Sequence, residues 1–224
     1  MQLAIVGGTG AIGAGLALRW ARDTDHAIRV GSREADRAAA AADRYRGRIR
    51  ARGYDVDLEG AANPDAVDGA DVVVVAVPPY SVVDAIDAIS DRLADGATVV
   101  TPAVGMRKED GGMRYHRPDA GSVTALARAV SPSAIPVVGA FHSLPADRLV
   151  DLDDPLGLDT VVVGDDAAAR SAIATLAEEI DGLRALDGGP IDNAPELEAL
   201  TPLLINLGRY NDDLHEVGVR FVSR

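Results

Sequence analysis

The fold is decided near the N-terminus, by the stretch Leu3-Ala4-Ile5-Val6-Gly7-Gly8-Thr9-Gly10-Ala11-Ile12-Gly13. Its first four residues form an apolar run that predicts a buried strand, and apolar residues then recur at helical spacing at Ile12, Leu16 and Trp20. Between the two, residues 8–13 match the dinucleotide-binding pattern G-x-G-x-x-G. We therefore predict that a dinucleotide binds at the start of the first helix, where free N–H groups receive phosphates. The alternative is a glycine-rich turn between two core elements.

The residues that this pattern assigns to the cofactor are Gly8, Thr9, Gly10, Ala11, Ile12 and Gly13. The first glycine permits a tight turn, the second lets the backbone approach a pyrophosphate, and the third packs the helix against the strand. Gly7, Gly10 and Gly13 also fit the G-x-x-G-x-x-G spacing of short-chain dehydrogenases. That class uses a Tyr-x-x-x-Lys pair, and the pair is absent, because the only lysine is Lys108 and Val104 stands four residues before it.

The composition is that of a globular protein with an acidic surface. The chain has 224 residues, of which 47% are hydrophobic, and its 22 basic and 35 acidic residues give a net charge of −13. Such a charge argues against nucleic-acid binding, which requires the neutralisation of phosphates. The scarcity of lysine together with this charge suggests adaptation to a salt-rich cytoplasm, where self-repulsion is screened.

Other classes are excluded by what the sequence lacks. With no cysteine, disulfides and thiolate metal sites are ruled out, and no metal site is expected. No apolar run is long enough to span a membrane, and the chain enters its first strand at once, so we expect no signal peptide and a cytoplasmic location.

Alternating strands and helices predict an α/β fold of the Rossmann type, a doubly wound parallel sheet, followed by a smaller C-terminal α/β domain. The expected boundaries are 1–145 for the dinucleotide-binding domain and 146–224 for the second, which continues the sheet or packs against it. The segment 105–119 is polar and lacks periodicity, so it is expected to be a long loop. Strands are expected at 28–30, 54–58, 72–77, 97–100, 135–140, 159–164 and 183–186, and helices at 33–52, 82–93, 122–130, 167–180 and 193–210.

The end of the second strand favours NADP over NAD. Where NAD-binding proteins carry an acidic residue for the ribose hydroxyl, this chain has Gly31-Ser32-Arg33, with Arg37 one helical turn further. Two cations near a helix N-terminus oppose its dipole, and a bound 2′-phosphate would reverse that penalty. The alternative is that Ser32 only caps the helix and both arginines are solvated.

The carboxyl ends of three other strands carry unusual residues, at Pro78-Pro79, Thr101-Pro102 and Phe141-His142. Ligands of open α/β sheets bind at this edge. His142 is the histidine that a strand brings to this edge, and the alternative is the role more common for a lone histidine, that of a hydrogen-bonded structural residue. Nothing in the sequence demands a general base, and a hydride passed between two bound carriers needs mainly alignment and exclusion of water.

Further blocks of sequence carry a family resemblance. They are Val6-Gly7-Gly8-Thr9-Gly10, Gly31-Ser32-Arg33, His142 with Leu144-Pro145-Ala146, the segment 179–184, and Leu200-Thr201-Pro202-Leu203. With these blocks the chain resembles the F420-dependent NADP reductases over nearly its whole length. The resemblance implies an oxidoreductase that passes a hydride, reversibly, between NADP and coenzyme F420, an 8-hydroxy-5-deazaflavin.

The resemblance also implies roles for individual residues. NADP would contact residues 9–12, and Ser32, Arg33 and Arg37 would take its 2′-phosphate. Residues near Pro79, Val83, Met106 and Ala146 would flank the nicotinamide, and His142 and Val217 would lie on the deazaflavin side, His142 as a positioning residue.

The resemblance implies a homodimer or higher oligomer as well, with the apolar segment 203–207 as its interface or as ordinary core. Two other functions stay open from the sequence. One is a catalytically silent NADP(H)-binding sensor, and the other is an NADPH-dependent reductase of a metal ion or an imine.

Overall fold

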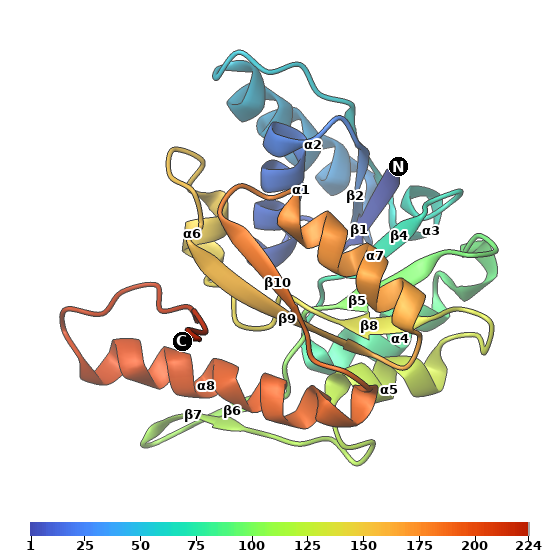
Figure 1. Ribbon diagram of the computed structural model, residues 1–224. Helices are drawn as coiled ribbons and strands as arrows, with labels where there is room; N and C mark the ends of the chain where they lie inside the picture. Colours follow the sequence, from blue (N-terminus) through green and yellow to red (C-terminus); the bar gives the residue numbers. More distant parts are fainter. Residues whose placement is uncertain (224) are drawn as a thin grey trace.

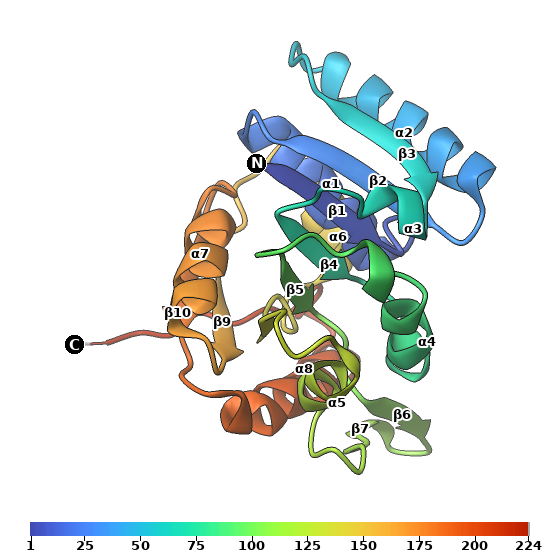
Figure 2. The ribbon, with the colours of Figure 1, turned by 90° about the vertical axis from the view of Figure 1, so that its right-hand side faces the viewer.

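The computed structural model describes residues 1–223, so Arg224, the last residue of the expected C-terminal domain, lies outside the described residues. Within that range a large sheet lies between helices (Figures 1 and 2). Its strands are β1 (Gln2–Val6), β2 (Ala27–Ser32), β3 (Leu58–Ala62), β4 (Val72–Val75), β5 (Thr98–Thr101), β8 (Val137–Gly139), β9 (Leu158–Gly164) and β10 (Leu183–Asp187). The helices are α1 (Ala11–Asp23), α2 (Ala35–Arg50), α3 (Asn63–Ala66), α4 (Val82–Asp87), α5 (Val123–Val130), α6 (Ala146–Val150), α7 (Ala167–Glu178) and α8 (Ala194–Tyr210).

The strand order is β10-β9-β8-β5-β4-β1-β2-β3. All neighbours are parallel except β8 and β9. The chain leaves β1 toward β2 and β3 and then crosses to β4 on the other side of β1. This reversal creates the crevice in which doubly wound folds bind their ligands. The predicted Rossmann-type α/β fold is confirmed.

Strands β9 and β10 continue the sheet beyond β8, which is one of the two expected arrangements of the C-terminal part. No break in the sheet marks residue 145, and the division into two domains there stays a prediction. Helix α8 runs below the sheet in Figure 1, and the chain after it turns back toward β9. No helix of residues 1–223 is both long and apolar enough to cross a membrane.

The central strands are buried on both faces, which explains their unbroken β-branched sequences. In β4, Val72 and Val74 pack in the core that α1, α2 and α7 cover. Val73 and Val75 pack in the opposite core, beneath α4 and α5. The run of valines therefore fills two cores at once.

The expected strand at 54–58 is wrong, because the edge strand β3 begins at Leu58 and ends at Ala62. Its sequence is dominated by small residues, which carry a weak strand signal. Packing against α2, which lies directly against the strand, requires one of them, Gly60, to lack a side chain. A Cβ on Gly60 would overlap the backbone of Ala38, so packing rather than propensity decides this element.

The expected loop at 105–119 is also wrong in part, because it contains the antiparallel hairpin β6 (Met106–Glu109) and β7 (Gly112–Tyr115). Helix α8 holds the hairpin in place, and the two lie side by side in Figures 1 and 2. The Asn206 side chain accepts a hydrogen bond from the backbone N–H of Met113 and donates one to its carbonyl, both at 2.8 Å. A two-stranded ribbon is marginal by itself, and its polar sequence predicts no structure without this partner.

Candidate functional site

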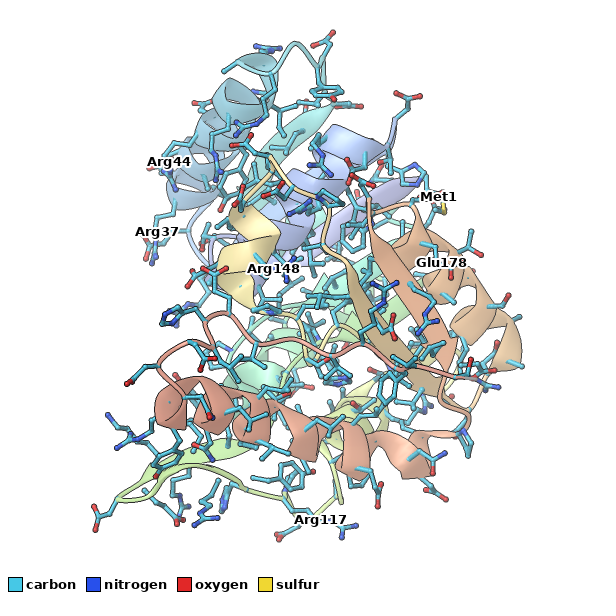
Figure 3. All side chains as sticks on the ribbon, turned by 60° about the vertical axis from the view of Figure 1, so that its left-hand side comes forward. Met1, Arg37, Arg44, Arg117, Arg148 and Glu178 are labelled. Carbon is cyan, nitrogen blue, oxygen red and sulfur yellow. The ribbon has the colours of Figure 1, made fainter. Side chains whose placement is uncertain are left out.

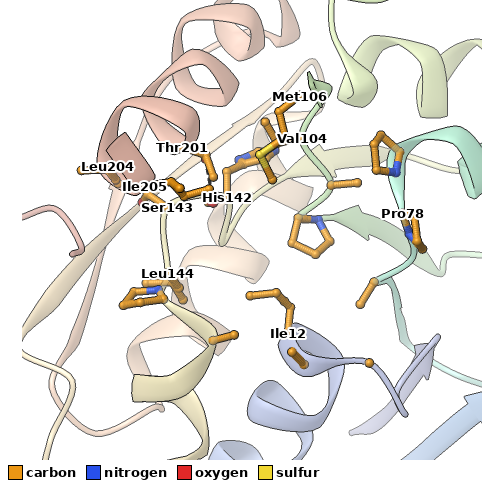
Figure 4. A pocket seen from close by; sticks show the side chains of 18 of the residues that line it. Ile12, Pro78, Val104, Met106, His142, Ser143, Leu144, Thr201, Leu204 and Ile205 are labelled. Carbon is orange, nitrogen blue, oxygen red and sulfur yellow. Dashed lines mark hydrogen bonds between the residues drawn. The ribbon is translucent and has the colours of Figure 1, made fainter. Parts of the chain in front are cut away.

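A cavity of about 560 Å³ opens at the carboxyl edge of the sheet. Figure 4 shows that its walls come from the start of α1, the segments after β4, β5 and β8, and α8. The turn at Glu216 and Val217 completes the lining. Most of the lining side chains are apolar, and the volume lies within the range of small-molecule sites. The cavity adjoins the reversal in strand order.

Eight of the predicted site residues line this cavity: Gly10, Ala11, Ile12, Pro79, Met106, His142, Ala146 and Val217. Seven do not: Gly8, Thr9, Gly13, Ser32, Arg33, Arg37 and Val83. The residues of the first group stand after four different strands or, for Val217, in the C-terminal turn. They are far apart in the sequence, and folding brings them together. Most of the second group lies at the glycine turn or at the end of β2, outside the cavity.

The glycine turn is built for close backbone approach. Gly10 is the N-cap of α1 and carries no side chain there, so the end of the helix is open. A Cβ on Gly13 would lie 2.8 Å from both the carbonyl oxygen of Gly7 and the Cα of Gly8. Because α1 packs this closely against the turn, the N–H groups of its first residues stand at the mouth of the cavity, where they can bind a pyrophosphate.

The end of β2 presents two cations. Arg33 and Arg37 are exposed, and no carboxylate of residues 1–223 forms an ion pair with either. Figure 3 shows Arg37 projecting outward from α2. Ser32 is buried, and it is not the N-cap of α2, because that position is Glu34, whose N–H donates to the Ser32 Oγ at 3.4 Å. The capping role considered for Ser32 is therefore wrong.

His142 stands at the carboxyl end of β8 and is only 7% exposed. Burial lowers the pKa of His142 to about 4, so the ring is neutral near pH 7. Its Nε2 lies 3.4 Å from the Thr124 Oγ1, and its carbonyl accepts a 2.8 Å hydrogen bond from the Thr201 hydroxyl. The structure thus gives it both attributes considered for it, since it lines the cavity and is hydrogen-bonded within the core.

Phe141, the residue before His142, has a strained backbone. Its φ is +67°, in the left-handed region that residues other than glycine rarely adopt. Its ring is buried edge-on against Trp20 with centroids 5.7 Å apart, and its N–H donates to the Thr160 hydroxyl at 2.9 Å. Such a conformation persists where the surrounding structure holds it in place. Here it determines the direction of the backbone as it leaves β8 and enters His142.

Sequence reasoning missed the contribution of α8. Thr201, Leu204 and Ile205 line the cavity, yet the sequence assigned them no role in binding. Glu198, one helical turn before Thr201, is fully buried and accepts hydrogen bonds from the N–H groups of Val123 and Thr124. The only available signal was the block Leu200-Thr201-Pro202-Leu203, which marks the segment but not its position.

The C-terminal segment that carries Val217 is fastened to β9. The Asp159 carboxylate accepts hydrogen bonds from Arg184 Nε at 2.9 Å and from the Phe221 N–H at 2.6 Å. The Asp159 N–H donates to the Val219 carbonyl at 2.8 Å. The hydrogen bond from Arg184, opposed by burial, lowers the pKa of Asp159 below its ordinary 3.8.

We expect Asp159→Asn to loosen this segment, because the ion pair with Arg184 is lost. The amide of Phe221 should exchange with deuterium faster than in the wild type. Because the folded pKa of Asp159 is depressed, its stabilising contribution is complete above about pH 4, its unfolded pKa. Acidification below that value should therefore have the same effect in the wild type. Asp187→Asn, which breaks the separate ion pair with Arg170, is the matched control. Unchanged exchange at Phe221 in the Asp159 variant contradicts the assignment.

Comparison with known proteins gives consistent results. Residues 2–105 match the family described as NADP oxidoreductase, coenzyme F420-dependent. The F420-dependent NADP reductase of Methanothermobacter thermautotrophicus is 36% identical over 227 residues, which cover 100% of this chain and 95% of that protein. The F420-dependent NADP reductase of Methanocaldococcus jannaschii is also 36% identical, over 92% of both chains.

Solved structures agree at the level of the fold. A protein of Arthrobacter described as a candidate F420-dependent NADP reductase superimposes with a TM-score of 0.77 over 94% of both chains, at 25% identity. A pyrroline-5-carboxylate reductase from Coxiella burnetii superimposes with a TM-score of 0.56 over 83% of this chain and 58% of its own, at 16% identity. The second likeness concerns the fold alone.

Proposed function

The chain belongs to the family of F420-dependent NADP reductases, and we propose that it transfers a hydride directly and reversibly between NADP and coenzyme F420. The observation that supports this most strongly is the apolar cavity between the glycine turn and α8. Its volume of about 560 Å³ suits two flat ring systems placed face to face. The glycine turn at its edge fits the pyrophosphate of NADP, because the N-cap Gly10 carries no side chain and leaves the N–H groups at the start of α1 open.

The two ring systems supply the carbons between which the hydride passes, and the deazaflavin also takes up a proton when it is reduced. The chain's own residues bind and align them. The N–H groups at the start of α1 hold the pyrophosphate, and Ser32, Arg33 and Arg37 hold the 2′-phosphate. Pro79, Met106 and Ala146 flank the nicotinamide, as does Val83, which lies on α4 and does not line the cavity. His142 and Val217 lie on the deazaflavin side.

The apolar walls exclude water, which favours transfer between aligned carriers over side reactions. Among the described residues of the cavity, only His142 and Glu216 can titrate, and burial keeps His142 neutral at pH 7. A site that accelerates a reaction by alignment needs few ionisable groups. This scarcity supports hydride transfer over reactions that depend on a strong general base.

The test is to mix the protein with NADPH and oxidised coenzyme F420 and to follow the visible absorption of the deazaflavin. We expect it to bleach as NADPH is consumed. Tight NADPH binding without bleaching would identify a sensor. Oxidation of NADPH by ferric ion or an imine, with the deazaflavin unchanged, would identify the other reductases.

Arg33→Ala should weaken NADPH binding about tenfold or more and leave NADH binding unchanged. A charge-assisted hydrogen bond to a phosphate contributes about 1.5–3 kcal/mol, and about 1.4 kcal/mol corresponds to a factor of ten. The dissociation constants of both nucleotides, measured by fluorescence titration, give the result. Arg44→Ala is the control, because Arg44 projects from the same helix further from its start (Figure 3). Equal losses for NADPH and NADH would remove the assignment.

We also propose that the protein forms a homodimer through α8. Leu203 and Leu207, which share a face of α8, are 52% and 38% exposed, so the alternative that this segment is ordinary core is wrong for these two residues, whereas the exposed Ile205 lines the cavity. Apolar side chains gathered on one helix are typical of an interface. The mass of the protein in solution is the measurement that tests it. The cytoplasmic location and the adaptation to salt stay predictions.

A further inference from the structure

A row of three buried polar side chains leads to the wall of the cavity, and only the last of the three lines it. It begins at Glu198 of α8, passes through Thr124 at the start of α5, and ends at the ring of His142. Glu198 and Thr124 are both fully buried, and the Thr124 hydroxyl lies 3.1 Å from the Glu198 Oε1 and 3.4 Å from the His142 Nε2. The three residues come from three different segments, and neither Glu198 nor Thr124 lines the cavity.

The hydrogen-bond donors around Glu198 favour the ionised form of its carboxyl group. Its oxygens accept hydrogen bonds from the N–H groups of Val123 and Thr124 at 3.0 and 2.9 Å, and from the hydroxyls of Thr124 and Tyr115 at 3.1 and 3.3 Å. The two N–H groups can only donate and the Thr124 hydroxyl can donate as well, whereas the Tyr115 hydroxyl shares its one hydrogen between Glu198 and the Gly121 carbonyl, both at 3.3 Å. Burial raises the pKa of Glu198 on balance, against the hydrogen bonds from the N–H groups of Val123 and Thr124, which lower it. The N-terminus of α5 also favours a negative charge at this point.

The direction of the hydrogen bonds follows from this charge. The Thr124 hydroxyl has one hydrogen, and the carboxylate of Glu198 takes it. Toward His142 the hydroxyl can therefore only accept, so the Nε2 of the neutral ring must carry the hydrogen. The other ring nitrogen, Nδ1, is then left without a hydrogen and can only accept a hydrogen bond.

We propose that Thr124 and Glu198 are positioning residues that fix His142 as the Nε2–H tautomer, with Nδ1 as an acceptor for a donor group of the deazaflavin. The ring imide N–H of a deazaflavin has the required chemistry. Thr201, on the same face of α8 as Glu198, holds the backbone carbonyl of His142 at 2.8 Å. Helix α8 thus sets both the place and the hydrogen-bonding polarity of this side chain. The choice of ligand rests on the proposed function, whereas the tautomer does not.

The test combines the ¹⁵N spectrum of the histidine rings with kinetics. The signals of His142 are identified by their loss in His142→Gln, and in the wild type without ligands we expect a protonated Nε2 and a bare Nδ1. Thr124→Val keeps the shape of the side chain and removes its hydroxyl. This variant should show a mixture of tautomers and a KM for coenzyme F420 raised about tenfold, with the Kd of NADPH unchanged. Thr124→Ser should restore both properties.

Tyr115→Phe is the matched control, because it removes a different hydrogen bond to Glu198 and leaves the contact with His142 intact. A hydrogen on Nδ1 in the wild type would overturn the proposal, even if the valine variant failed to fold. An unchanged tautomer and KM in Thr124→Val would overturn it as well. If the wild type transfers no hydride, the spectra still decide the tautomer, so failure of the proposed function is recognised separately.

Discussion

Gly13→Ala should raise the Kd of NADPH at least a hundredfold. Alanine normally stabilises a helix by about 1 kcal/mol relative to glycine, so helix propensity alone predicts a gain. Here the added Cβ would lie 2.8 Å from the Gly7 carbonyl oxygen and the Gly8 Cα, and both are backbone atoms that cannot rotate away. Helix α1 must shift, and its first N–H groups leave the position from which they bind the pyrophosphate.

Titration of the nucleotide and unfolding in urea measure the two consequences. The overpacked contact should lower the free energy of unfolding by about 1–3 kcal/mol. Gly47→Ala is the control, because Gly47 lies in α2 and a Cβ there meets no atom within 4 Å. It should leave binding unchanged and keep or increase stability. Wild-type affinity for NADPH in Gly13→Ala would show that the turn does not hold the nucleotide.

Prediction from the sequence succeeded where one local pattern is sufficient. The run of valines in β4 and the glycine turn before α1 identify a doubly wound sheet because each pattern has a single structural cause. It failed for β3 and the hairpin β6–β7, whose stability depends on distant partners. Gly60 is needed only because α2 lies against it, and the hairpin is ordered only because Asn206 of α8 binds its backbone. No local pattern carries that information.

The candidate site divides in the same way. The glycine turn and the arginines after β2 each form a short stretch of sequence, so their roles could be predicted from spacing, and these roles stay predictions. His142 could be placed at the carboxyl edge because it follows a strand. The positions of Thr124 and Glu198 could not be predicted, because an isolated threonine or a glutamate in an amphipathic helix is ordinarily exposed to solvent or caps a helix. Their role depends on the packing of α8 across the start of α5, which joins residues more than 70 positions apart.

Glu198→Ala should lower the free energy of unfolding by about 3–5 kcal/mol, because it leaves several buried hydrogen-bond donors without their acceptor. Three buried donors lose their acceptor, namely the N–H groups of Val123 and Thr124 and the Thr124 hydroxyl. An unsatisfied buried donor costs about 1–3 kcal/mol, and these losses are not additive. Because α8 carries part of the cavity wall, the KM for coenzyme F420 should rise as well.

Urea denaturation with an unchanged m-value would attribute the loss to the native state. Glu196→Ala removes an exposed carboxylate two residues earlier on the same helix and should change stability by less than about 0.5 kcal/mol. The contrast between the two variants separates the loss of the buried hydrogen bonds of Glu198 from the changes in helix propensity and net charge, which are the same in both. If Glu198→Ala lost less than about 1 kcal/mol, water would have to reach the start of α5, and α8 would not be the element that holds it in place.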